Sequence, residues 1–233
     1  MENKKNIPKC IGIIMDGNRR WAKEQGLTSL EGHQRGYEKL KEVLGWAKDV
    51  GIENMITYAF STENWNRSEE EVSYLLDLFR KMLTEELEEL MKEDARIIFA
   101  GDISRFPEDI QTSIAEVHKK TKDKTPFTLV VALSYGGRAE ILRAVNEIVM
   151  NADSGDKHVV TEEEFARHLW TKDVPDPDMI IRTGGEWRLS GFLPWQSVYS
   201  ELFFPETYWP AFTKEEFDGL IAEFAQRERR RGK

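Results

Sequence analysis

The stretch that decides the fold reads Cys10-Ile11-Gly12-Ile13-Ile14-Met15-Asp16-Gly17-Asn18-Arg19-Arg20-Trp21. It opens with an apolar run of strand length and then passes through an acid, a glycine and an asparagine to two arginines. In an α/β protein, ligands bind where a buried strand ends at its carboxyl edge. At that edge, Gly17 lets the backbone approach a ligand closely, and the arginines offer guanidinium forks to an anion.

The acid at this turn, Asp16, points to a metal ion. A carboxylate beside an anion-binding turn would repel the anion unless a cation lies between them. Mg²⁺ takes one or two carboxylates and fills its remaining positions with water and phosphate oxygens. The stretch therefore predicts a metal–diphosphate site. On these residues alone, a strand followed by a solvated turn is the alternative.

The composition fits one cytoplasmic domain spanning residues 1–233, and its 40% of hydrophobic residues is ample for a core. A net charge of −9 argues against nucleic acid as a partner. The single cysteine, Cys10, excludes an internal disulfide and fits a reducing compartment. Nowhere do 18 apolar residues run together, so we expect no membrane span.

Strand-like and helix-like segments alternate along the chain, which predicts an α/β fold with a mainly parallel central sheet flanked by helices. A capping box at Ser68 starts a long helix whose apolar stripe runs to Leu90, and its acidic residues 84–94 are interpreted as a solvated face. The predicted strands are residues 10–15, 55–60, 95–100, 127–133, 179–181 and 198–204.

Four of the predicted strands end in polar turns, at residues 16–21, 61–67, 135–138 and 182–190. Parallel strands would bring all four turns to one edge of the sheet. Neither a G-x-G-x-x-G after the first strand nor a P-loop motif occurs, so a phosphate site would have to be built from arginines. Any one of them alone could be a surface ion pair, but together they outnumber what one phosphate needs and favour two diphosphates: Arg19, Arg20, Arg67, Arg182 and Arg188.

These turns resemble the cis-prenyltransferases, or (Z)-isoprenyl diphosphate synthases, a family that includes undecaprenyl diphosphate synthase. The matching runs follow the family's order over nearly the whole chain: residues 15–18, 20–22, 32–33, 58–67, 101–102, 135–138, 178–186, 188–190, 195–196 and 199–202.

The resemblance implies roles for individual residues. Asp16 would bind Mg²⁺ and help the allylic diphosphate depart, and Glu201 would reach the metal from the partner's side of a homodimer. Asn64 would be the proton acceptor, although an amide is a weak base and a diphosphate oxygen could serve instead. The implied substrate-binding residues are Gly17, Asn18, Arg19, Arg20, Trp21, His33, Ser61, Thr62, Glu63, Trp65, Arg67, Arg182, Arg188, Leu189 and Ser190.

The implied activity is condensation of isopentenyl diphosphate with an allylic diphosphate such as farnesyl diphosphate, with cis double-bond formation, to an undecaprenyl-type product. Phe60 or Trp65 could stabilise the allylic cation, and the chain would grow in a hydrophobic tunnel. A shorter-chain synthase is the first alternative. A non-catalytic subunit would have lost Asp16, and a haloacid-dehalogenase-type phosphatase would need an acid where Asn18 stands.

Expectations for Ser29, Arg19, Phe127 and the basic tail stay open. Ser29 replaces an arginine that is usual in the family, and Arg19 stands where glycine is common and could partly replace that charge. Phe127 is either the floor of the tunnel or a core residue. The basic tail, residues 227–233, would suit peripheral contact with anionic lipid for product release, or equally a solvated helix end.

Overall fold

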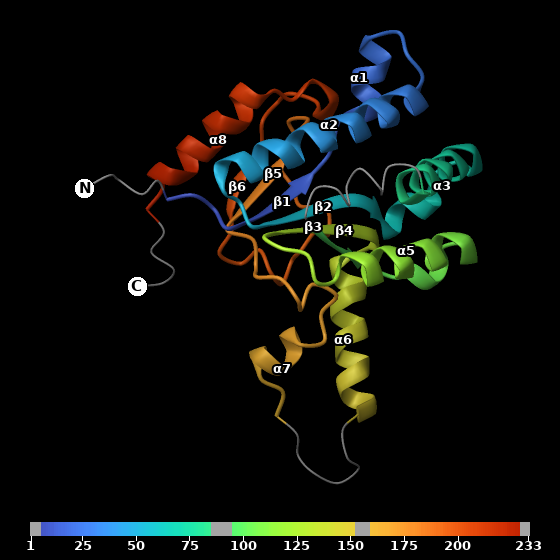
Figure 1. The fold of residues 1–233 in the computed structure, drawn as a ribbon, viewed down its shortest axis with the longest axis vertical. Helices are drawn as coiled ribbons and strands as arrows, with labels where there is room; N and C mark the ends of the chain where they lie inside the picture. The colour runs from blue at the N-terminus through green and yellow to red at the C-terminus, as the bar shows by residue number, and fades with distance from the viewer. Residues whose placement is uncertain (1–5, 85–94, 152–158, 229–233) are drawn as a thin grey trace.

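Six parallel strands form one sheet in the order β3-β4-β2-β1-β5-β6, in a computed structural model that describes residues 6–84, 95–151 and 159–228 (Figure 1). The order places β1 in the interior of the sheet, between β2 and β5. The predicted parallel α/β fold is therefore confirmed. The strands are β1 Cys10–Ile14, β2 Asn54–Ser61, β3 Ala95–Ala100, β4 Phe127–Tyr135, β5 Met179–Arg182 and β6 Glu201–Phe203.

Capping residues mark the ends of several helices, and α2, Ser29–Val50, shows this most clearly. The side chain of Thr28 accepts from the backbone of Glu31 in a reciprocal capping box, and Gly51 ends the same helix at φ 90°. Thr213 and Glu216 cap the last helix in the same way. The helices are α1 Asn18–Glu24, α2 Ser29–Val50, α3 Glu69–Thr84, α5 Glu108–Thr121, α6 Gly137–Asn151, α7 Glu162–Ala166 and α8 Lys214–Gln226, with short 3₁₀ turns at Thr62–Asn66, Ile103–Arg105 and Trp209–Ala211.

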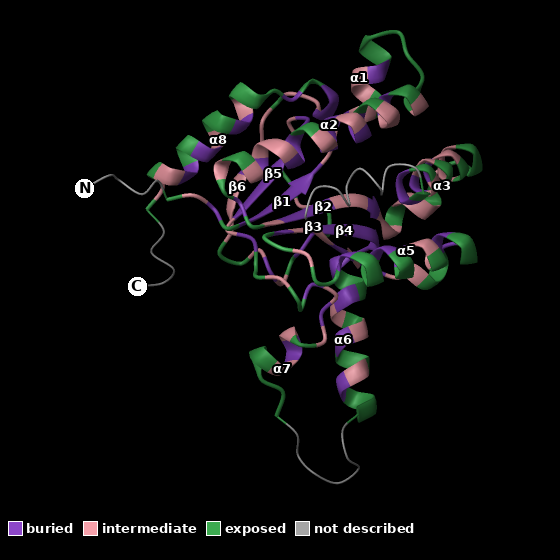
Figure 2. Ribbon diagram, in the orientation of Figure 1, coloured by how far each residue is buried: buried purple, intermediate pink, exposed green. Residues whose placement is uncertain are grey.

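The two faces of the sheet are covered differently. Apolar residues of α2, α3, α5 and α8 pack on one face and form the larger core with alternate residues of the strands. On the other face, Phe192 and Leu193 of the long segment between β5 and β6 pack against Ile14, Ile56 and Val130. This face therefore depends on a loop where helices were expected, and Figure 2 shows the strands buried between the two coverings.

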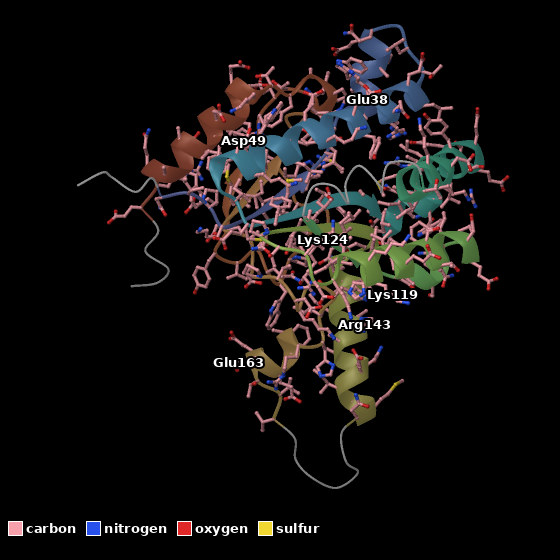
Figure 3. The ribbon with its side chains drawn as sticks, viewed as in Figure 1. Glu38, Asp49, Lys119, Lys124, Arg143 and Glu163 are labelled. Carbon is pink, nitrogen blue, oxygen red and sulfur yellow. The ribbon has the colours of Figure 1, made fainter. Side chains whose placement is uncertain are left out.

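Many charged side chains lie on the outer surfaces of the helices. Figure 3 labels Glu38 and Asp49 on α2, Lys119 on α5 and Glu163 on α7, with their side chains outside the sheet. Helices α6 and α7 extend away from the sheet and share a small core of their own (Figure 1). Within the described ranges, we find no helix with the length and apolar character needed to cross a bilayer.

Two sequence expectations differ from the structure or lie outside it. The sixth strand is shorter than predicted, because Val198 and Tyr199 are exposed and only Glu201–Phe203 pair with β5. The helix expected to continue through Leu90 is described to Thr84. The acidic residues 85–94, most of the polar loop at 151–158 and residues 229–233 of the basic tail lie outside the described residues.

Candidate active site

The turn after β1 is held in place from both sides. Gly17 adopts φ 105°, a left-handed conformation that favours glycine, and a Cβ there would lie 2.7 Å from the Tyr208 ring. The carbonyl of Asp16 accepts hydrogen bonds from the Thr183 hydroxyl at 2.8 Å and the Trp209 backbone at 3.0 Å. The chain therefore fixes Asp16 at the carboxyl edge of the sheet, as predicted.

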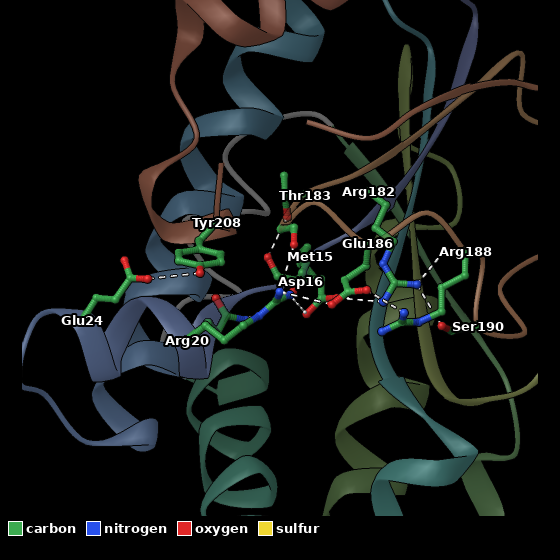
Figure 4. A network of polar contacts seen from close by, with 12 residues as sticks. Met15, Asp16, Arg20, Glu24, Arg182, Thr183, Glu186, Arg188, Ser190 and Tyr208 are labelled. Atoms are coloured by element: carbon green, nitrogen blue, oxygen red, sulfur yellow. Dashed lines mark hydrogen bonds and ion pairs between the residues drawn. The ribbon is translucent and has the colours of Figure 1, made fainter. Parts of the chain in front are cut away.

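The carboxylate of Asp16 lies between two guanidinium groups (Figure 4). Arg182 Nη2 donates to its Oδ2 at 2.7 Å, and Arg20 Nη2 lies 3.2 Å from its Oδ1. Partial burial raises the pKa of Asp16, but the hydrogen bond and charge of Arg182 and the charge of Arg20 outweigh it, so the pKa lies below its ordinary value. Asp16 is therefore ionised at neutral pH.

An arginine-rich recess of about 290 Å³ surrounds this turn. Arg20 donates to the Gly184 carbonyl at 2.9 Å and lies 5.1 Å from the centre of the Tyr208 ring. Glu186 is the acid opposite Asp16 and pairs with Arg188 at 2.6 Å and with Arg20 at 3.4 Å (Figure 4). The lining residues are Met15, Asp16, Gly17, Asn18, Arg19, Arg20, His33, Arg67, Glu186 and Arg188.

Arg182 is the most enclosed of the predicted arginines, with 5% of its surface exposed. Its Nη1 donates to the Ser190 hydroxyl at 2.8 Å and to the Arg188 carbonyl at 2.5 Å, while its Nη2 holds Asp16. Arg182 therefore ties the turn after β1 to the loop that follows β5. Ser190 adopts φ 50°, a left-handed conformation that is strained for a residue with a side chain.

Glu71, in the first turn of α3, collects three side chains from other segments. It accepts from Arg67 at 2.8 Å, contacts His33 Nε2 at 3.2 Å and lies 3.5 Å from Arg19. Burial lowers the pKa of His33, the charges of Arg67 and Arg19 lower it further, and the contact with Glu71 only partly offsets this. A neutral imidazole therefore faces the recess, and the positive charge there comes from the arginines.

The recess adjoins a largely apolar cavity of about 240 Å³. Five residues line both spaces, namely Met15, Asp16, Asn18, His33 and Arg67. A smaller cavity of about 20 Å³ continues inward and shares Tyr37, Leu40, Met82 and Val131 with the larger one. The other lining residues of the larger cavity are Ile14, Gly36, Tyr58, Ala59, Ser61, Asn64, Leu75, Leu78, Phe79, Arg182, Ser190 and Trp209.

The end of β2 and the turn after it contribute Ser61 and Asn64 to the cavity, beside Arg67. Asn64 accepts from the Ser61 backbone at 3.0 Å through Oδ1, and both residues line the space. Trp65 instead donates to the Ser134 hydroxyl at 2.9 Å and packs edge-on against Phe60, 4.9 Å between ring centres. Neither ring lines the cavity, so the expectation that Phe60 or Trp65 stabilises a cation there is not supported by the geometry.

Twelve of the predicted site residues line the recess or the cavity, and six do not. Trp21, Thr62, Glu63, Trp65 and Leu189 lie on the same segments but line neither space. Glu201 lies at the amino end of β6, level with Met179 and Ile11, which places it about 16 Å from Asp16 along the strand direction. Within one chain these two acids lie at opposite edges of the sheet, and Glu201 bonds Arg227 instead, at 2.8 Å.

The donor set fits a magnesium ion only in company with a ligand. Among the described residues, no cluster of three or more His, Cys, Asp or Glu side chains is arranged to hold a metal. Asp16 supplies one carboxylate at the mouth of an arginine-lined recess. That arrangement suits Mg²⁺, which accepts one carboxylate when water and phosphate oxygens supply the rest.

Three charged or polar residues at the site, Glu71, Tyr58 and Glu186, were not predicted as site residues. Glu71 stands four residues after Arg67 on the helix that the capping box starts, a spacing that could have revealed the pair. Tyr58 lines the cavity, and its hydroxyl lies 3.2 Å from the Tyr135 carbonyl and 3.4 Å from the Ser190 carbonyl. Its place inside the motif at 58–67 was the available signal.

Comparison with known proteins identifies the family. A family model described as putative undecaprenyl diphosphate synthase matches residues 14–232. An isoprenyl transferase of Thermotoga maritima is 48% identical over 226 residues, which cover 97% of this chain and 97% of that protein. A ditrans,polycis-undecaprenyl-diphosphate synthase ((2E,6E)-farnesyl-diphosphate specific) of Micrococcus luteus is 41% identical over 232 residues, 99% and 93% of the two chains.

A solved structure agrees with the sequence relatives. Lavandulyl diphosphate synthase from Lavandula x intermedia, in complex with dimethylallyl diphosphate, superposes with a TM-score of 0.93 at 32% identity and covers 97% of this chain and 99% of its own. The resemblance inferred from the motifs is confirmed, and the phosphatase alternative has no support. The chain belongs to the undecaprenyl diphosphate synthase family and is a prenyltransferase.

Proposed function

We propose that this prenyltransferase condenses isopentenyl diphosphate with an allylic diphosphate such as farnesyl diphosphate and forms a cis double bond in a polyprenyl diphosphate. The observation that carries the proposal is an arginine-lined recess that shares five lining residues with a largely apolar cavity. A substrate with a diphosphate head and a hydrocarbon tail would fill both spaces at once. The names of the relatives support the same reaction class.

The allylic diphosphate would occupy the recess. Arg19, Arg20 and Arg67 would face its oxygens, and each charge-assisted hydrogen bond would contribute about 1.5–3 kcal/mol. To bind the ligand, Arg19 and Arg67 would exchange part of their contact with Glu71 for phosphate oxygens. The predicted substrate-binding residues that line neither space would hold the segments around the recess in place: Trp21, Thr62, Glu63, Trp65 and Leu189.

Isopentenyl diphosphate would be held by the loop after β5. Arg188 projects into the recess, and Arg182 and Ser190 line the cavity beside it. Because Arg182 bonds both Asp16 and Ser190, it would hold the two diphosphates at a fixed separation. Such positioning is a main source of rate when two substrates must meet.

Bond cleavage would proceed with charge separation. The C–O bond to the allylic diphosphate breaks, and the arginines of the recess stabilise the negative charge that develops on the leaving group. Bound at Asp16, Mg²⁺ would supply further electrostatic stabilisation of the diphosphate. The allylic carbon then bonds to the terminal carbon of isopentenyl diphosphate.

Loss of a proton from the adduct creates the new double bond. Asn64 lies at the cavity wall, with Oδ1 engaged by the Ser61 backbone, so its amide is oriented. Asn64 remains the proposed proton acceptor, with a diphosphate oxygen as the alternative because an amide is a weak base.

The growing chain would extend inward through the larger cavity toward the smaller one. At about 240 Å³ the larger cavity exceeds the roughly 150 Å³ that holds one benzene ring, so it has room for the first isoprene units of a tail. Further growth would require the residues shared by the two cavities, Tyr37, Leu40, Met82 and Val131, to move apart. A shorter-chain (Z)-prenyl diphosphate synthase is the second candidate beside an undecaprenyl-type product.

A homodimer is part of the proposal. Helix α6 exposes an apolar stripe away from its small core, with Leu142 at 63%, Val149 at 66% and Val145 between them. A second copy that covers such a stripe would remove apolar surface from water. In such a dimer, Glu201 would join the metal site of the partner.

The basic tail, residues 227–233, would contact anionic lipid as the apolar product leaves.

The decisive experiment supplies the pure protein with Mg²⁺, isopentenyl diphosphate and a panel of allylic diphosphates, and then sizes the extracted products. Products longer than the primer by whole isoprene units, with cis double bonds by NMR, are expected. The absence of elongated product with every primer would refute the proposal. The length of the product decides between the undecaprenyl-type and shorter-chain readings.

A further inference from the structure

Helix α6 carries a buried acid that the proposed reaction does not use. Glu140, in the first turn of α6, is 0% exposed. Three donors converge on its carboxyl group: the Tyr135 hydroxyl at 2.5 Å, the Gln196 side-chain amide at 3.0 Å and the Trp170 backbone N–H at 2.9 Å. Burying a carboxylate is costly unless it is fully hydrogen-bonded, so such a group needs an explanation.

The loop that Glu140 reaches is strained. Between β5 and β6, Ser190, Gly191 and Leu193 all adopt positive φ, at 50°, 80° and 50°. Two of these residues carry side chains, and such conformations persist only where surrounding contacts determine them.

On one side of the loop, contacts with α6 hold the backbone in this strained conformation. The Gly137 backbone donates to the Gly191 carbonyl at 2.8 Å, and a Cβ at Gly137 would lie 2.0 Å from Pro194 Cδ. Gln196 is itself buried, and its amide bonds both Glu140 and the Thr171 hydroxyl, the latter at 2.8 Å. The loop therefore rests directly on the first turn of α6.

The other side of the same loop forms the site. The Arg188 carbonyl and the Ser190 hydroxyl accept from Arg182, which in turn holds Asp16. Tyr58 reaches the Tyr135 and Ser190 carbonyls, and its ring stacks on Phe192 with 4.8 Å between centres. A shift of the loop would move Ser190 and Arg188 relative to Arg182.

We propose that Glu140 is a positioning residue that anchors the 188–196 loop through Gln196 and Tyr135 and thereby sets the geometry of the isopentenyl diphosphate subsite. This inference rests on the proposed function, because that function assigns Arg188 and Ser190 to that substrate. Glutamine is a poorer partner than the acid, because one of the two acceptor oxygens becomes an NH2 group, while Tyr135, Gln196 and the Trp170 backbone all donate to the carboxyl group. This anchoring role would account for the presence of an acidic residue, Glu140, at a fully buried position of α6.

The test is the substitution Glu140→Gln, with steady-state kinetics for each substrate. We expect the KM for isopentenyl diphosphate to rise about tenfold, with kcat and the KM for the allylic diphosphate within about twofold of wild type. Glu147→Gln is the matched control, because Glu147 lies on the same helix, partly exposed, and pairs with Arg143 and His168. It should change neither KM.

A second variant guards against a folding defect. Gln196→Ala truncates the loop side of the anchor and should reproduce the rise in KM for isopentenyl diphosphate. The double variant Glu140→Gln with Gln196→Glu returns a carboxylate to the pair and should recover part of that rise. An unchanged KM in folded Gln196→Ala, or a parallel loss for both substrates, would overturn the anchor. Absence of product from the wild-type protein would overturn only the proposed function.

Discussion

The two edges of the sheet each hold a carboxylate paired with an arginine, yet only one pair faces a cavity. At the carboxyl edge, Asp16 bonds Arg182 at 2.7 Å, and both residues line the space that continues inward. At the amino edge, Glu201 bonds Arg227 at 2.8 Å, and neither residue lines the recess or the two cavities described above. Similar ion pairs thus differ in what surrounds them.

The surroundings follow from strand direction. Turns after parallel strands supply free polar groups, so the carboxyl edge gathers Gly17, Arg182 and the strained loop at Ser190. At the amino edge the chain enters the strands, and its charges pair locally, as with Arg227 on Glu223 and on the Phe203 ring. An ion pair becomes chemically useful only where a ligand can reach it.

The largest effect should come from the carboxyl-edge acid. Asp16→Ala removes the carboxylate while Arg182 and Arg20 remain, so we expect product formation to fall about 1,000-fold or more. Rates are measured with both substrates and Mg²⁺ at saturation. A circular dichroism melt close to wild type is required to show that the fold survives. Wild-type-like turnover in the variant would refute the metal role of Asp16.

Glu201, the acid at the amino edge, tests most directly whether only the carboxyl edge takes part in the reaction. If Glu201 reaches a metal in the partner subunit, Glu201→Gln should lower turnover about 100-fold, although the acid lies far from Asp16 in its own chain. Mixing this variant with Asp16→Ala would then form heterodimers with one intact site. After random exchange we expect about a quarter of wild-type turnover. No recovery on mixing would confine Glu201 to its pair with Arg227.

Phe127 tests how far inward the site extends toward the amino edge. It begins β4, is 2% exposed in the core, and does not line the cavities, whereas Leu129 on the same face of the strand lines the smaller one. Phe127→Ala should therefore cost about 3–5 kcal/mol of stability, a Tm decrease of roughly 6–20 °C, and leave product length unchanged.

Leu129→Ala is the matched control for that experiment. It enlarges the smaller cavity, so the product distribution should shift to longer chains by at least one isoprene unit. If Phe127→Ala lengthens the product instead, the floor of the tunnel lies one step closer to the amino edge than the cavities indicate.

The sequence predicted the carboxyl edge well and the amino edge poorly, for physical reasons. Strand runs that end in glycine and charge mark a ligand edge directly, which is why Asp16, Arg182 and Ser190 were expected together. Glu201 was expected at the metal only through family resemblance, because spacing cannot tell at which end of a short edge strand a residue lies. Glu140 gave no signal, since an acid in the first turn of a helix usually faces water.

The smallest effect should come from Ser29, at the rim of the carboxyl edge. Ser29 is exposed at the first position of α2, one turn before His33, and therefore on the face of the helix that reaches the recess. An arginine there would add one charge-assisted contact to the allylic diphosphate. Ser29→Arg should lower the KM for that substrate about tenfold and leave the KM for isopentenyl diphosphate nearly unchanged.

The outcome also assigns a role to Arg19. Arg19 is exposed and lies 3.5 Å from Glu71, a loose contact that leaves it free to turn toward a diphosphate. If Arg19 already supplies the charge that Ser29 lacks, Ser29→Arg will change neither KM, and Arg19→Gly will raise the KM for the allylic diphosphate. In the Arg19→Gly background, Ser29→Arg should then restore binding, because the two positions would serve the same oxygens from α1 and α2. If both single variants leave the KM unchanged, neither position binds the diphosphate.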